Sequence, residues 1–215
     1  MTEGVRLRRD AQRNLERLMT AAAEAFRERG LQVPLEEIAQ RAGVSAGTLY
    51  NRFRNREALI DAVMPALVEA GVRDALARAQ AIEDPWEALT VYVTLVCELQ
   101  ADNPALNDAV SRRFADAEAL TAMCDAQMEH ARGLLERART AGALRPDCTV
   151  EDLMYLFWST STIVRATAGV APRTWRRALA INLDGLRARA VGEPLPEPPL
   201  TPAQLHEALL MKGTY

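Results

Sequence analysis

Residues 38–53 constrain the fold more than any other segment, and they read Ile-Ala-Gln-Arg-Ala-Gly-Val-Ser-Ala-Gly-Thr-Leu-Tyr-Asn-Arg-Phe. Two short helices that cross at a steep angle need a small residue where they approach most closely, which Ala39 supplies. The turn between them needs a residue that tolerates positive φ, which Gly43 supplies, and Ser45 stands at the expected N-cap of the second helix. We therefore predict a helix-turn-helix over about 35–42 and 45–53. An ordinary αα-hairpin within a helical bundle is the alternative.

The second helix of this pair carries groups suited to DNA. In a helix-turn-helix it lies in the major groove, with its N-terminal residues nearest the base edges. Thr48 and Tyr50 offer hydroxyls and Arg52 a guanidinium, and the N-terminus of the next helix at Asn55 and Arg56 adds free N–H groups for a phosphate. Upstream arginines form either a DNA-contacting arm or a merely solubilising tail: Arg6, Arg8, Arg9 and Arg13.

Charge is distributed unevenly along the chain, whose net charge is −3. Residues 1–60 hold 11 arginines against 8 acidic residues, while the remaining residues carry a net charge of −6. A basic head on an acidic body is expected when only one end touches phosphate. The acidic body argues against a protein that coats DNA without sequence preference, because such a protein needs a denser basic surface.

Apolar residues recur at helical spacing from end to end, and no stretch alternates with the period of a strand. We expect these further helices, by approximate range: one ending at Gly30, then 55–80, 86–101, a short one from 103, 116–141, 149–168, 174–189 and 201–212, the last after a Pro-rich linker at 192–199. The longest apolar run, 153–164, is shorter than the ~20 residues that a bilayer requires. We therefore expect a soluble, cytoplasmic protein, with Cys97, Cys124 and Cys148 as small buried hydrophobes.

Residues 12–64 resemble the DNA-binding region of TetR-family regulators. The matching stretches are "AAAEAFRERG", "LEEIAQRAGVSAGTLYNRF" and "NREALIDAV", and "DPWEALTVYVTLVCELQADNPAL" looks like a common C-terminal subtype. The resemblance implies an all-α fold in which a three-helix DNA-binding domain, 1–55, joins a larger ligand-binding and dimerisation bundle, 56–215. Many members have Thr or Ser where this chain has Pro34, so the phosphate contact of that residue does not carry over.

The resemblance also implies a function and residues that carry it. The chain would be a homodimeric repressor that leaves its double-stranded DNA operator when an unidentified small molecule binds; an activator, or a DNA-binding protein without ligand gating, is the alternative. The DNA contacts that carry over position by position are Ser45, Ala46, Gly47, Thr48, Tyr50, Arg52 and Arg56. No cofactor, metal or membrane partner is expected. An enzyme is disfavoured because no catalytic motif is present and His130 and His206 are the only histidines.

The C-terminal part offers candidates for a ligand pocket and a dimer interface, as the resemblance implies. Apolar or aromatic residues with a few polar tips suit a pocket: Trp86, Tyr92, Cys97, Phe114, Met123, Gln127, His130, Tyr155 and Trp158. The last two main helices would form a four-helix bundle with a second copy through Leu153, Leu156, Ile163, Leu179, Leu183 and Leu186. Both sets serve equally well as the core of a single chain, which is the alternative.

Overall fold

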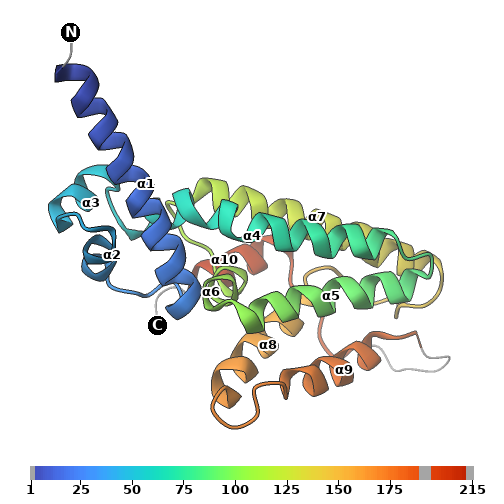
Figure 1. The fold of residues 1–215 in the computed structure, drawn as a ribbon. Coiled ribbons are helices and arrows are strands. Elements are labelled where there is room, and N and C mark those ends of the chain that lie inside the picture. The colour runs from blue at the N-terminus through green and yellow to red at the C-terminus, as the bar shows by residue number, and fades with distance from the viewer. Residues whose placement is uncertain (1–2, 189–194, 212–215) are drawn as a thin grey trace.

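The computed structural model describes the backbone of residues 3–188 and 195–211 and the side chains of residues 9–188 and 195–210. Within these ranges the regular structure is helical, which confirms the predicted all-α class (Figure 1). The helices are α1 (Glu3–Arg29), α2 (Leu35–Ala42), α3 (Ala46–Arg52), α4 (Arg56–Gln80), α5 (Pro85–Asp102), α6 (Pro104–Ser111), α7 (Glu118–Thr140), α8 (Leu153–Thr167), α9 (Trp175–Leu186) and α10 (Pro202–Met211).

The bounds of α2, α3 and α4 follow from local caps. Gly43 ends α2 in the left-handed conformation, with φ of 65°. The Ser45 hydroxyl accepts a hydrogen bond from the Thr48 N–H at 3.1 Å, and the Asn55 side chain accepts one from the Ala58 N–H at 2.8 Å. Because these interactions lie within a few residues of each other in the chain, they are readable from the sequence.

Two apolar clusters form the interior, and α4 contributes to both. The first cluster packs α1, α2 and α3 against Leu59 and Val63 of α4 and against α6. The second packs α5, α7, α8, α9 and α10 against Ala75 and Ala79 near the other end of α4. The division at residue 55 into a DNA-binding and a ligand-binding domain stays a prediction, since α4 and α6 pack against the N-terminal helices.

The second cluster is the larger helical bundle in Figure 1, where α4, α5 and α7 lie beside one another. At its far side α8 and α9 pack together, and α8 also contacts α5 and α6. The last helix, α10, begins as predicted, because Thr201 and Gln204 bond reciprocally, each backbone N–H to the other's side chain. It docks through Leu205 and Leu209, which are buried.

Two predicted helices are too long. The helix predicted over 174–189 ends at Leu186, because residues 187–188 run beside 143–145: Arg187 pairs with Leu144, and the Ala188 N–H donates to the Ala143 carbonyl at 2.9 Å. The helix predicted from residue 149 begins at Leu153. Residues 189–194, which include part of the predicted linker at 192–199, and the side chains of Arg6 and Arg8 lie outside the described residues.

A helix can cross a membrane only if it is long and apolar enough. No helix among the described residues is both long and apolar enough to cross a bilayer.

Candidate nucleic-acid interface and ligand cavity

Helix α3 buries one side and exposes the other. Leu49 is fully buried and Phe53, just after the helix, is nearly so. Tyr50 is 46% exposed, and Gly47 and Arg52 are also exposed. The helix is therefore anchored by its apolar side and keeps a polar face toward solvent, as a reading helix requires.

The N-terminal turn of α3 is small and polar. The Ser45 and Thr48 hydroxyl oxygens lie 2.9 Å apart, so the two side chains are held in one hydrogen-bonded pair. Ala46 is partly buried. A Cβ atom added at Gly47 would meet only the Ser45 hydroxyl, at 3.8 Å. Space is therefore free around Gly47, and a duplex can approach the backbone closely there.

The Tyr50 hydroxyl donates a hydrogen bond to the Glu36 carboxylate of α2 at 3.0 Å. The pKa of Glu36 is lowered, first by a backbone hydrogen bond and then by the one from Tyr50. The pKa of Tyr50 is raised by the same side-chain bond. A phosphate contact by Tyr50 must therefore replace the bond to Glu36.

The Arg56 side chain bonds to the loop between α1 and α2. Its Nη1 donates to the carbonyl oxygens of Leu31, at 3.0 Å, and Val33, at 2.5 Å. The guanidinium thus fastens the α1–α2 loop to the start of α4 and is only partly exposed. These two bonds use the donors of Nη1 and do not involve Nη2 or Nε, so a phosphate contact by Arg56 stays a prediction.

Two exposed side chains beside the predicted contacts escaped the sequence reasoning. Asn51 lies four residues after Gly47, hence on the same side of α3, and Arg54 follows the helix. An asparagine amide can bond an adenine edge in the major groove. The spacing of four residues from Gly47 was the signal in the sequence that could have identified Asn51. Arg9 and Arg13, in turn, lie exposed on α1, which continues as a helix to Glu3.

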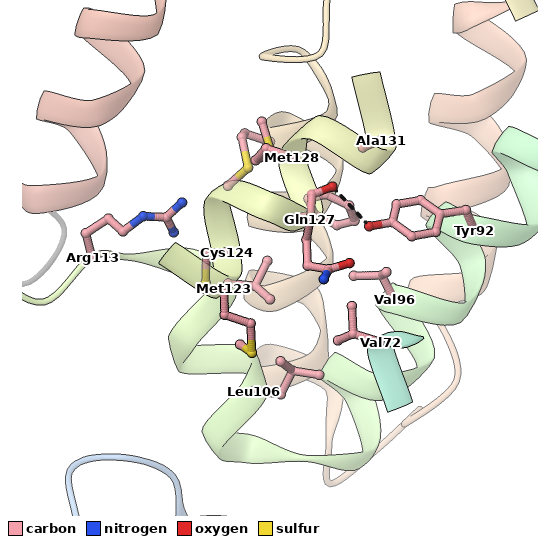
Figure 2. A pocket seen from close by; sticks show the side chains of 13 residues that line it. Val72, Tyr92, Val96, Leu106, Arg113, Met123, Cys124, Gln127, Met128 and Ala131 are labelled. Atoms are coloured by element: carbon pink, nitrogen blue, oxygen red, sulfur yellow. Dashed lines mark hydrogen bonds between the residues drawn. The ribbon is translucent and has the colours of Figure 1, made fainter. Parts of the chain in front are cut away.

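A cavity of about 70 Å³ lies inside the bundle (Figure 2). Helices α4, α5, α6, α7 and α8 all contribute to its walls, which are lined by Val72, Tyr92, Val96, Leu106, Val110, Arg113, Met123, Cys124, Gln127, Met128, Ala131, Met154 and Phe157. Three of the predicted pocket residues are among them, Tyr92, Met123 and Gln127. Burial raises the pKa of Tyr92 to about 12 and also raises that of Cys124, so both groups stay protonated and neutral at neutral pH.

The other predicted pocket residues lie outside this cavity. Trp86 lines a different, open groove between α5 and α9. Cys97 and Phe114 are buried in the two apolar clusters, Cys97 with its sulfur 3.5 Å from the Thr160 hydroxyl. Residues at the protein surface or partly buried near it complete the set: His130, Tyr155 and Trp158. Except for Phe114, which lies between α6 and α7, these residues lie on helices that also line the cavity. The face of a helix does not reveal which buried side chains border a void.

The leucines predicted for the dimer interface lie in this chain's own core. Leu153, Leu156, Leu179 and Leu183 are buried in the second cluster, and Ile163 and Leu186 pack partly buried against it. The four buried leucines therefore serve as core of this chain, which was the alternative, while a contact of Ile163 and Leu186 with a second copy stays a prediction. The outward faces of α8 and α9 instead expose other apolar side chains, Tyr155 at 47% and Ile181 at 62%.

The start of α7, which forms one wall of the cavity, is bonded to α4, the helix that follows α3. The Leu120 N–H, in the first turn of α7, donates to the Asp61 carboxylate of α4 at 2.8 Å. The Asp116 N–H donates to the Glu57 carboxylate, and the Asn55 amide donates to the Asp116 carboxylate, both at 2.7 Å. The start of α7 is thus capped by side chains of α4 rather than by its own N-cap residue.

Comparison with protein families gives two matches. Residues 18–63 match the model described as bacterial regulatory proteins, tetR family. Residues 84–188 match the model described as transcriptional regulator SbtR-like, C-terminal domain. The first match contains α2, α3 and the start of α4, and the second contains most of the bundle.

Among curated proteins, two Pseudomonas putida regulators are 36% identical over 110 residues, the probable HTH-type regulator ArpR and the HTH-type regulator TtgR. Each match covers 51% of this chain, and the chain spans about half the length of these relatives. The HTH-type transcriptional repressor KstR2 of Rhodococcus jostii is 26% identical over 174 residues, which cover 78% of this chain and 82% of that protein.

Solved structures share the fold. A structure of RolR in complex with resorcinol superposes with a TM-score of 0.59 at 21% identity, covering 88% of this chain and 98% of that chain. FadR of Bacillus subtilis in complex with stearoyl-CoA superposes with a TM-score of 0.60 at 16% identity, covering 80% of this chain and 99% of that chain. At these identities the likeness concerns the fold alone.

Proposed function

Because this chain belongs to the TetR family of bacterial regulatory proteins, we propose that it regulates transcription by binding a double-stranded DNA operator through α3. One observation carries the proposal: α3 is anchored by Leu49 and Phe53 and leaves Gly47, Tyr50 and Arg52 exposed. The contacts would come from Ser45, Ala46, Gly47, Thr48, Tyr50 and Arg52, within a DNA-binding unit of residues 1–55, and from Arg56 directly after it. Such a regulator acts in the cytoplasm, where the chromosome lies.

The second part of the proposal is repression relieved by a small molecule in the cavity. A ligand that enlarges the cavity displaces the wall formed by α7, and α7 is bonded to the start of α4 through Asp61, Glu57 and Asp116. Movement of α4 changes the position of α3, which directly precedes it. The similarity to the repressor KstR2 supports repression rather than activation.

A homodimer is needed because two reading heads must meet successive major grooves, ~34–36 Å apart. The exposed side chains of α8 and α9, with Ile181 as the most exposed of the large apolar ones in these helices, support these outer faces as the contact. Light scattering is expected to give a mass near twice 23.7 kDa. Ile181→Asp is expected to give a monomer, and a wild-type monomer would contradict the dimer.

The test of DNA binding compares the DNA upstream of the protein's own gene with a scrambled duplex of the same composition. Fluorescence anisotropy at about 50 and about 200 mM salt separates the possibilities, because phosphate contacts weaken steeply with salt while base contacts set the preference. We expect a preference for the upstream DNA at both concentrations. Equal affinity for the two duplexes would indicate a DNA-coating protein. Failure to bind either duplex would contradict the proposal that the chain regulates transcription by binding DNA.

A further inference from the structure

The walls of the cavity are apolar except at a few groups. Valine, leucine, alanine and phenylalanine side chains together with three methionines, Met123, Met128 and Met154, form most of the lining. Methionine is unbranched and flexible, so these walls can repack around a guest. The cavity of about 70 Å³ is roughly half the ~150 Å³ of a cavity that holds benzene, so a ring-sized guest must displace the methionines.

Arg113 supplies a cation at one end of the cavity. In Figure 2 it stands at one side of the lining residues, with Tyr92 at the other and Gln127 between them. The Arg113 side chain is only 9% exposed, while its ion-pair partner Asp125, 3.1 Å away, is 67% exposed. A guanidinium has five N–H donors, and Asp125 is the carboxylate paired with it in the described part of the chain. Donors therefore remain for a second oxyanion, in the geometry that suits a carboxylate.

The position of Arg113 is fixed by its backbone as well as by its side chain. Its N–H donates to the Leu209 carbonyl of α10 at 3.0 Å. Because α10 is docked through Leu205 and Leu209, the residue that carries the guanidinium is held at the cavity. A preorganised cation binds an anion with less ordering cost than a mobile surface arginine.

Gln127 supplies the second polar group. Its Oε1 is buried and has no hydrogen-bond donor among the described residues. The nearby Tyr92 hydroxyl donates instead to the Gln127 backbone carbonyl, at 3.4 Å. An unsatisfied buried acceptor costs free energy, which a guest with a hydroxyl would recover.

We infer that the cavity binds a small carboxylic acid with an apolar body, its carboxylate on Arg113 and a hydroxyl on Gln127. That this ligand is the effector rests on the function proposed above; that it binds here does not. An uncharged guest of the same shape would leave Arg113 as it is and gain nothing from its free donors.

The test uses the full chain and two probe acids, 4-hydroxybenzoic acid and 6-hydroxyhexanoic acid, each beside its methyl ester and the acid that lacks the hydroxyl. Calorimetric titration measures binding directly. We expect at least one acid to bind at least about tenfold more tightly than its ester, as loss of a charge-assisted hydrogen bond predicts. The hydroxylated acid is expected to bind more tightly than the acid without the hydroxyl.

Three variants locate the acid. Arg113→Met is expected to abolish the preference for acid over ester, and Arg73→Met, which removes an exposed arginine of α4 outside the cavity, is expected to keep it. Asp125→Asn removes the competing carboxylate and is expected to tighten acid binding severalfold. Because Asp125 lies largely at the surface, this variant keeps the inference testable if Arg113→Met does not fold.

Either equal binding of acids and esters or an unchanged preference in Arg113→Met would overturn the inference, and so would the absence of acid binding at about 10 mM. The operator complex is measured separately with the same probes. If acid binding depends on Arg113 but leaves the DNA complex intact, the inferred ligand class stands and the proposed release from DNA by that ligand is wrong. If esters and acids release the DNA alike, the proposed release by a ligand stands and the inferred preference for an acid is wrong.

Discussion

The carboxylate of Asp108, on α6, accepts a hydrogen bond at 2.9 Å from the backbone N–H of Leu31, just after α1 ends. Its other oxygen accepts one at 3.0 Å from Arg165 of α8. Leu31 is completely buried, so its N–H has no access to water. A single side chain of α6 therefore joins the N-terminal helices to α8.

Asp108→Ala is expected to lower the free energy of unfolding by about 1–3 kcal/mol, because the buried Leu31 N–H loses its acceptor. Asp108→Asn keeps an acceptor oxygen for Leu31 and removes the charge that faces Arg165, so its loss is expected to be smaller. Urea unfolding followed by circular dichroism measures both. Equal losses in the two variants would show that the Leu31 bond contributes nothing.

Gly47→Ala separates folding from DNA binding. Alanine stabilises a helix relative to glycine by about 0.5–1 kcal/mol, and the added Cβ meets no atom of the protein closer than 3.8 Å. We expect a more stable protein that binds its operator more weakly, since the methyl group occupies the space next to the duplex.

Gly133→Ala is the matched control for Gly47→Ala. Gly133 is exposed within α7, and a Cβ there meets nothing within 4 Å. We expect a similar gain in thermal stability with DNA affinity unchanged. If Gly47→Ala binds the operator as tightly as Gly133→Ala does, α3 does not approach the duplex at this position.

Local signals made most of the helix bounds predictable. Caps that bond within three residues of each other mark the starts of α3, α4, α5, α6 and α10: Ser45, Asn55, Asp84, Asn103 and Thr201. The end of α9 was not predictable in this way, because Leu186 and Arg187 bond to residues about forty positions earlier.

The sites were less predictable than the fold for the same reason. The face of α3 follows from helical period alone, which identifies Leu49 as buried and Tyr50 as exposed. The direction of the Arg56 guanidinium depends on the loop at 31–33 folding over α4. Amphipathic helices α8 and α9 show that their leucines are buried, but not whether the same chain or a second copy buries them.

Arg56→Ala is expected to act on the fold. The guanidinium donates to two carbonyl groups of the α1–α2 loop, and losing these bonds at a partly exposed site is expected to cost about 1–2 kcal/mol of unfolding free energy. Arg54→Ala removes a neighbouring exposed arginine and is expected to change stability by less than about 0.5 kcal/mol. Chemical denaturation of both variants tests this. Equal unfolding free energies of the two variants would show that the bonds of Arg56 to the loop contribute nothing to stability.

Asp147 gives the fold a dependence on acid pH. The Arg145 guanidinium donates to both of its oxygens, at 2.5 and 2.9 Å, and lowers its pKa from 3.8 to about 2, with help from the Leu195 N–H. Because the folded pKa is depressed, this contribution to stability is complete above about pH 4 and is lost as the pH falls toward 2.

Asp147→Asn is therefore expected to be less stable than the wild type at pH 5, with a difference that shrinks as the pH falls toward 2. Thermal unfolding at pH 5, 4 and 3 gives the comparison. A difference that stays constant over this range would show that Asp147 does not titrate as its contacts predict.

The preference of Arg52→Ala for upstream over scrambled DNA, measured as a ratio of dissociation constants, tests most directly that α3 reads the operator. Arg78→Ala, which removes an exposed arginine far along α4, matches the change in charge. Losing a base contact corresponds to about 1–3 kcal/mol, so we predict a ratio roughly 5- to 150-fold lower in Arg52→Ala and unchanged in Arg78→Ala. A wild-type ratio in Arg52→Ala would contradict the account.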